Sequence, residues 1–189
     1  MIKEAENKGF KVARIEGINV SETNLRSRIK NKKPSFIFFN GHGSDTSLFN
    51  NQEQEFINVD SADVFKEIVT YAIACNCLVK LGPAAIENGG YSFIGYKNPF
   101  WIARDHKYEA TPLKDKIARP IMECSNIIVK SLLKGNTVEQ SVKKSHENAK
   151  ESILSLINSK EPLAPASLQA LVANDSALDF KGDASAKIM

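Results

Sequence analysis

Short apolar runs divide the first half of this chain, and polar stretches with helix-type spacing separate them. Runs of about five residues rich in Phe, Ile, Val and Tyr are typical of β-strands, whereas apolar residues three or four apart are typical of helices. The pattern predicts strands at Phe10–Ile15, Ser35–Asn40, Val69–Ala74 and Tyr91–Tyr96. It predicts helices at Met1–Lys8, Ser21–Lys32, Asp60–Ile68 and Pro83–Asn88, with a small hairpin within Ser47–Val59.

The regular alternation of helices and strands indicates the fold class. Ser35–Asn40 is apolar almost throughout, as expected of a strand that is covered on both faces. Alternating elements of this kind favour a mostly parallel sheet with helices on both sides. We therefore expect an α/β protein, built as a three-layer α/β/α sandwich.

The second half is predicted to be helical and then to lose regular structure. Pro120–Lys134 has apolar residues along one side, and Thr137 and Gln140 form a capping box that opens another helix. From Pro162 onward Pro, Ala and Asp are mixed with short apolar pieces, which predicts an extended tail with a short strand at Ala177–Phe180. We expect a domain at 1–160 and a C-terminal extension at 161–189.

The chain opens in a predicted helix, although doubly wound sheets usually begin with a central strand. The domain is thus predicted to lack its first strand. Either the chain is a fragment, or another polypeptide completes the sheet.

The composition of the chain argues against several classes of protein. The chain has 189 residues, of which 42% are hydrophobic and 25% charged, as in ordinary globular domains. A net charge of +3 without a dense basic stripe gives no case for nucleic acid. No apolar run is long enough to span a membrane, and the N-terminus is no signal peptide. Three cysteines, an odd number, favour reduced thiols and a cytoplasmic location.

Two predicted strands end in residues that could do chemistry together. His42 follows the run from Phe36 and lies between Gly41 and Gly43, and Cys75 follows the run from Val69. In open α/β sheets the site lies beyond the carboxyl ends of the strands, where both residues fall. A thiol attacks as its thiolate, and a nearby imidazole can take its proton. The sequence therefore predicts a Cys–His nucleophilic site.

Backbone donors are expected to complete this site. Acyl transfer needs N–H groups that stabilise the developing oxyanion, and glycine lets the backbone approach closely. We expect the N–H groups of Gly43 and Cys75 to serve. The plainer alternatives are a buried core cysteine and a histidine that merely ends a strand.

At these residues the chain resembles the clan CD cysteine peptidases of the caspase-like fold, which include caspases, gingipains, clostripain, separase and CHAT domains. The shared pattern is an apolar strand ending in His-Gly and another ending in Ala-Cys, here Phe36–Gly43 and Val69–Cys75. The stretch Leu81–Tyr96 is similar to the helix, glycine turn and strand behind the nucleophile in gingipain-like and CHAT members. The caspase Gln-Ala-Cys-Arg-Gly signature is missing, and the His-to-Cys spacing is shorter than the about 50 residues of caspases.

The resemblance implies His42 as general base, Cys75 as nucleophile and a caspase-like sheet. It also implies that the residues beside the nucleophile, Ile73 and Asn76, help bind substrate, without assigning a cleavage specificity. Asp45 is either a recognition acid or a turn former. Trp101 either walls a substrate pocket or packs on the following helices.

The function expected is hydrolysis of peptide bonds by a cysteine endopeptidase, with a protein or peptide substrate and no cofactor. A non-catalytic caspase-like binding module or subunit is the alternative, and another hydrolase or transferase using Cys75 is a weaker one. No metal is expected, because Cys75 and Cys77 lack the spacing of a zinc pair. Cys77 is expected to be a core thiol or a redox partner.

Overall fold

The protein is α/β, with a central sheet of four strands in the order β1-β5-β6-β7. In the computed structural model, which describes residues 1–188, β1 (Phe36–Asn40), β5 (Val69–Ile73) and β6 (Ser92–Tyr96) run parallel. β7 (Leu178–Gly182) pairs antiparallel with β6. The sheet is therefore mostly parallel, as the alternation of elements predicts.

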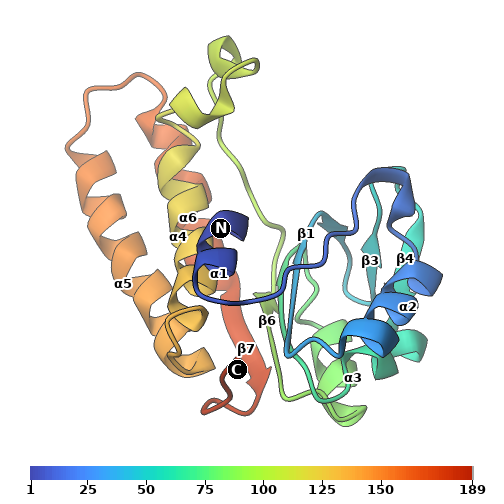
Figure 1. Cartoon of the computed structure of the whole chain (residues 1–189). Coiled ribbons are helices and arrows are strands. Elements are labelled where there is room, and N and C mark those ends of the chain that lie inside the picture. Colours follow the sequence, from blue (N-terminus) through green and yellow to red (C-terminus); the bar gives the residue numbers. More distant parts are fainter. Residues whose placement is uncertain (189) are drawn as a thin grey trace.

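Helices cover this sheet from two sides, an arrangement compatible with a three-layer sandwich (Figure 1). One layer holds the short α1 and three longer helices. These are α1 (Ile2–Asn7), α4 (Arg119–Leu132), α5 (Val138–Ile157) and α6 (Ala164–Ala177). The other layer holds α2 (Glu22–Lys32), α3 (Leu81–Glu87) and the 3-10 helix η2 (Val59–Phe65).

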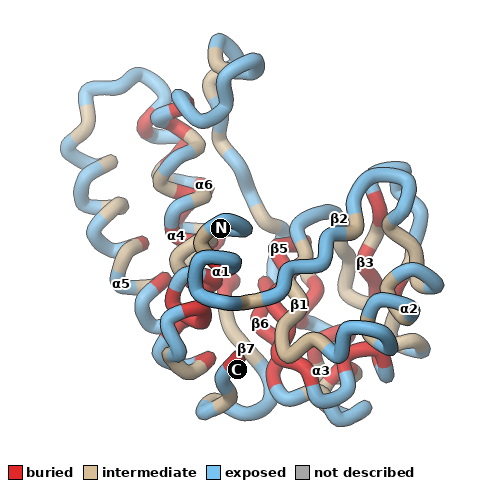
Figure 2. Tube along the Cα trace, viewed as in Figure 1, coloured by how far each residue is buried: buried red, intermediate tan, exposed pale blue. Residues whose placement is uncertain are grey.

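Each of the three parallel strands contributes to two hydrophobic cores, one on each side of the sheet, because its side chains alternate between the faces. In β1, Phe36 and Phe38 pack on the core beneath α4 and α5, and Ile37 and Phe39 pack on the core beneath α3 and η2. Every residue of β5 is buried, which appears as a continuous red strand in the centre of Figure 2. Burial on both faces explains why these strands are apolar throughout.

A small antiparallel sheet leads away from the end of β1. It consists of β2 (His42–Gly43), β3 (Ser47–Phe49) and β4 (Glu55–Asn58). The predicted hairpin within Ser47–Val59 is confirmed as β3 and β4. Because β2 starts directly after β1, the small sheet determines where His42 lies.

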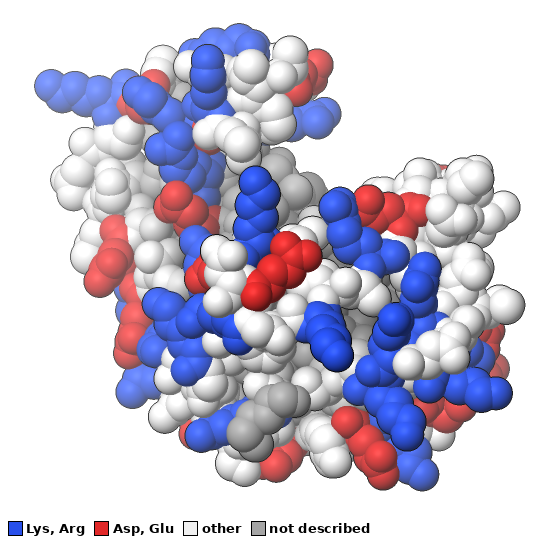
Figure 3. Space-filling view, viewed as in Figure 1, with Lys and Arg blue, Asp and Glu red and all other residues white. Residues whose placement is uncertain are grey.

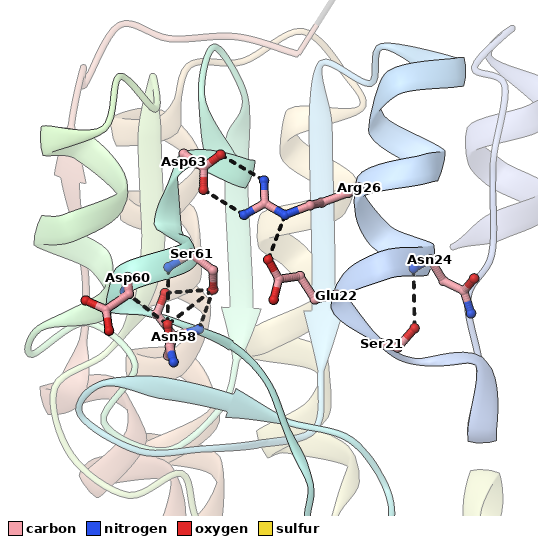
Figure 4. A network of polar contacts seen from close by, with 8 residues as sticks. All are labelled: Ser21, Glu22, Asn24, Arg26, Asn58, Asp60, Ser61 and Asp63. Atoms are coloured by element: carbon pink, nitrogen blue, oxygen red, sulfur yellow. Dashed lines mark hydrogen bonds and ion pairs between the residues drawn. The ribbon is translucent and has the colours of Figure 1, made fainter.

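A network of polar contacts attaches α2 to η2 (Figure 4). The Arg26 guanidinium donates to both oxygens of Asp63, at 2.8 and 2.7 Å, and to Glu22 at 2.7 Å. The helix predicted at Asp60–Ile68 is a 3-10 helix that begins at Val59. Asn58 caps it by accepting hydrogen bonds from its first N–H groups, two residues before the predicted start. Polar caps of this kind satisfy backbone N–H groups that the first turn leaves unpaired.

The C-terminal part corrects the sequence-based expectation. The helices predicted at Pro120–Lys134 and after Thr137 are confirmed, including the Thr137 capping box. The expected extended tail is instead helix α6, which has a proline in its first turn, followed by the predicted strand as β7. Ala177 and Leu178 belong to the main core, so residues 161–188 are part of the same packed unit rather than an extension.

The predicted strand at Phe10–Ile15 does not form. Residues 8–16 run across the front of the molecule without joining either sheet, and the 3-10 helix η1 (Gly17–Asn19) follows (Figure 1). A strand requires a hydrogen-bonded neighbour, and no described strand pairs with this segment. Two further 3-10 helices, η3 (His106–Tyr108) and η4 (Pro112–Lys114), lie in the long connection from β6 to α4.

Candidate active site

The ends of β1 and β5 lie side by side at one edge of the sheet. Asn40 pairs with Ile73, and the Gly41 N–H donates to the Ile73 carbonyl at 3.1 Å. The residues that follow, His42 on one strand and Cys75 on the other, therefore leave the sheet at the same place.

Gly43 makes the closest approach between the two segments. A methyl group at this position would lie 2.8 Å from Ala74 Cβ, 2.8 Å from the Cys75 carbonyl oxygen and 3.4 Å from the Cys75 nitrogen. These distances are too short for any side chain, so only glycine allows the two backbones to pack in this way.

Cys75 lies at a turn, and its sulfur is hydrogen bonded. The residue is half-buried, and its Sγ accepts the Phe100 N–H at 3.3 Å. Asn76, directly after it, has the left-handed φ of 55° that Asn tolerates better than most residues. The chain thus turns sharply after β5, which leaves the sulfur at the rim of the sheet.

The His42 side chain is exposed, and it forms no hydrogen bond with Cys75 Sγ within residues 1–188. Its backbone pairs with Phe49 in the small sheet. The structure brings the two predicted residues to adjacent segments, while leaving the imidazole free in solvent. Contacts between a nucleophile and its base are often long without substrate and tighten when substrate binds.

The Gly43 N–H is free to bind an oxyanion. Ser44 donates to Ser47 at 2.9 Å, and pairs along an antiparallel ladder alternate between bonded and unbonded. Gly43, opposite Leu48, therefore occupies an unbonded position and directs its N–H away from β3. The Cys75 nitrogen lies 3.4 Å from where a Gly43 Cβ would be, so the two backbone nitrogens belong to segments in close contact.

Burial and backbone contacts describe the surroundings of three predicted substrate-binding residues: Ile73, Asp45 and Asn76. Ile73 is 2% exposed and packs in the main core, so its side chain does not reach a substrate surface. The Asp45 carbonyl oxygen accepts the N–H groups of Lys80 and Leu81, at 3.0 and 2.9 Å, where α3 begins. The Asn76 N–H donates to the Asn98 carbonyl at 3.3 Å, so it is not available as an oxyanion donor.

Trp101 lies one residue beyond the amide that contacts Cys75 and is 58% exposed. Its backbone N–H and carbonyl both bond to the side chain of Asn174, which lies in α6. Sequence reasoning marked Trp101 but missed the Phe100 amide and Asn174. A main-chain donor carries no sequence signal, and Asn174 falls in the stretch predicted to be extended.

The other two cysteines are core residues. Burial raises the pKa of Cys77 to about 12 and that of Cys124 to about 11. Cys77 Sγ lies 3.7 Å from the Ala72 carbonyl oxygen, and all three cysteines are free thiols. A protonated, buried thiol is a poor nucleophile, so Cys75 is the cysteine whose surroundings suit chemistry.

A cavity of about 220 Å³ lies away from these residues, between the start of α2 and the β3–β4 hairpin. Its lining includes Val20, Glu22, Asn50 and Phe56, and it contains neither His42 nor Cys75. Among residues 1–188, no group of three or more His, Cys, Asp and Glu side chains is placed to hold a metal ion. No helix in this part of the chain is both long and apolar enough to cross a membrane.

Comparison of the chain with protein-family models, with curated proteins and with solved structures gave no match.

Proposed function

We propose that this protein is a cysteine peptidase of the caspase-like type, with Cys75 as nucleophile and His42 as general base. The observation that supports the proposal is the close approach of Gly43, in the His-Gly turn, to the backbone of the half-buried Cys75. The cysteines are free thiols, which accords with the proposed cytoplasmic location.

The reaction would follow from these positions. His42 takes the thiol proton, and the Cys75 thiolate attacks the peptide carbonyl carbon, with the Gly43 and Cys75 N–H groups facing the oxyanion. Collapse of this intermediate breaks the C–N bond, and protonated His42 gives its proton to the departing amine. Water, deprotonated by His42, then hydrolyses the thioester and restores the thiol.

Substrate would lie along the rim between β2 and the segment at Trp101. The exposed indole offers an apolar surface beside the nucleophile. Since Ile73 is buried, side-chain selectivity would come from Trp101 and the loops around it rather than from the residues preceding Cys75.

The test is alkylation of Cys75 by iodoacetamide at neutral pH, with and without His42→Ala. Loss of a general base is expected to slow labelling of Cys75 by about tenfold to a hundredfold. His106→Ala is the matched control, because His106 is also exposed and contacts only the neighbouring Glu109. Equal, slow labelling of the wild type and His42→Ala would refute the Cys–His pair, and a peptide-library cleavage profile would then distinguish other hydrolases.

A second candidate function is a binding module or subunit, and the free edge of β1 favours it. Ser35 accepts from Val69 and Gly41 donates to Ile73, so the alternating backbone groups of Ile37 and Phe39 also face β5. The N–H and carbonyl groups of Phe36, Phe38 and Asn40 then face outward, where the described strands provide no partner.

An added β-strand would fit this edge. Unpaired, half-buried apolar edge strands are common sites for strand addition by another chain. Lys and Arg side chains gather over α2 on the face seen in Figure 3, which would favour a strand with acidic residues. Peptide hydrolysis by the isolated chain, eluting as a folded monomer from a size-exclusion column, would exclude this candidate.

A further inference from the structure

The C-terminal helix reaches the candidate active site through one buried amide. Asn174 in α6 is 5% exposed. Its Oδ1 accepts the Trp101 N–H at 2.8 Å, and its Nδ2 donates to the Trp101 carbonyl at 2.7 Å. Because a single side chain satisfies both backbone groups of one residue, it fixes that segment in position and orientation, as a neighbouring strand would.

The segment that Asn174 holds also carries the hydrogen-bond donor to the nucleophile. Phe100 precedes Trp101, and its N–H points at Cys75 Sγ at 3.3 Å. The Phe100 ring packs edge-on against Tyr96, with the ring centroids 4.8 Å apart. Two contacts therefore fix the position of the Phe100 amide: the Phe100 ring packs in the core, and Asn174 bonds to both backbone groups of Trp101, a pair of bonds that we call the Asn174 clamp.

An N–H donor favours the charged form of a thiol over the neutral form. We propose that Asn174 is a positioning residue, which holds the Phe100 N–H on Cys75 Sγ so that the thiolate is stabilised for attack. The inference rests on the proposed role of Cys75 as nucleophile. Asn174 would act through Phe100 rather than by touching the thiol or a substrate, and helix α6 would thereby have a function at the site.

A merely structural role for Asn174 makes a different prediction. If the clamp only anchored α6, its loss would lower stability and leave the thiolate equilibrium unchanged. Ser167 supplies the matched control. It is also buried in α6 and donates to the Ile117 carbonyl at 2.7 Å, yet within residues 1–188 its side chain forms no hydrogen bond with the segment at Phe100.

The experiment measures iodoacetamide labelling of each cysteine in the full chain by peptide mapping, at pH 7 and at pH 10. Removing one hydrogen bond to a charged group in Asn174→Ala should slow Cys75 labelling at pH 7 by about tenfold. At pH 10, where thiols ionise without assistance, the rates of variant and wild type should converge. Ser167→Ala should match the wild type at both pH values.

Cys77 and Cys124 report on folding in the same samples, because both are buried. If Asn174→Ala exposes them, the measurement moves to Asn174→Asp, which keeps the size of the side chain and the Trp101 N–H acceptor but loses the donor. A threefold or larger slowing at pH 7 with Cys77 still protected would support the proposal.

An unchanged rate at pH 7, or an equal slowing at both pH values, would overturn it. The His42→Ala result separates this inference from the proposed function. If His42→Ala slows labelling and the Asn174 variants do not, only the positioning role is wrong. If the wild-type Cys75 reacts no faster than a cysteine in an unstructured peptide, the nucleophile itself is wrong.

Discussion

The protein contains two neighbourhoods in which a cysteine lies near histidine-bearing elements, and they differ in what surrounds the sulfur. At the end of β5, Cys75 is half-buried and accepts an N–H. Between α4 and α5, Cys124 is 6% exposed and donates its S–H to Asn148 Oδ1 at 3.2 Å. One sulfur accepts a hydrogen bond, and the other donates one.

The histidine contacts alone would favour the neighbourhood of Cys124. His146, on the helix that packs against α4, bonds to Asp175 at 2.7 Å, an arrangement typical of an oriented catalytic base. Yet desolvation by burial raises the pKa of the nearby Cys124 to about 11. The comparison teaches that solvation and hydrogen-bond direction decide reactivity, because a nucleophilic thiol must lose its proton near neutral pH.

The largest expected effect is the difference in reactivity between these thiols. In the native protein at pH 7.5, Cys75 should be alkylated at least about a hundredfold faster than Cys124 or Cys77, whose burial disfavours the thiolate. Peptide mapping after timed iodoacetamide exposure measures the rates. Comparable labelling of Cys124 in folded protein would contradict the contrast between the two neighbourhoods.

The second largest effect is expected from Gly43→Val, which should disturb the surroundings of Cys75 and leave those of Cys124 unchanged. The added side chain would overlap Ala74 Cβ and the Cys75 carbonyl, which must move apart. A displacement of about 1 Å at a reacting group can cost a hundredfold in rate, so we expect a loss of this order in any peptidase activity. Circular dichroism should show a retained fold, and protection of Cys124 from labelling should be unchanged. Full activity in this variant would show that the contact with Cys75 is dispensable.

His146→Ala tests the helical neighbourhood in turn. It removes the partner of Asp175, and both side chains are only partly buried, so the free energy of unfolding should fall by about 1 kcal/mol. Urea denaturation measures this change. The rate of Cys75 labelling should stay at the wild-type value. A fall in this rate as large as that in His42→Ala would show that His146 also assists Cys75 and would contradict the contrast between the two neighbourhoods.

The smallest effect is expected at the surface pair of Arg26 and Asp63, which lies outside both neighbourhoods. The Arg26 guanidinium lowers the pKa of the Asp63 carboxyl, whose side chain is 56% exposed, so the pair should contribute under about 1 kcal/mol. Because the carboxyl pKa is lower in the folded protein, the pair stabilises the fold above the unfolded pKa of about 4. This contribution is lost as the pH falls through the folded pKa. The stability difference between wild type and Asp63→Asn should therefore be present at pH 7 and absent near pH 2. A difference that persists in acid would mean that the pair acts through something other than charge.

Much of the sheet could be predicted from the sequence, and the reasons are local. The runs that become β5 and β6 are buried on both faces and the run that becomes β1 is partly buried, so their composition identifies them. The run at Phe10–Ile15 also contains Lys11 and Arg14, and no strand within residues 1–188 pairs with it. Helix α6 was missed because its alanine-rich stretch has little amphipathic spacing and begins near a proline.

The sequence by itself determined that His42 and Cys75 follow the ends of two strands. A His-Gly turn and a cysteine that follow adjacent parallel strands must leave the sheet at one edge, whatever the rest of the chain does. Only the tertiary structure decided what surrounds the sulfur. The Phe100 amide, the Asn174 clamp and the exposure of His42 depend on contacts between residues far apart in the chain, and no local pattern encodes such contacts.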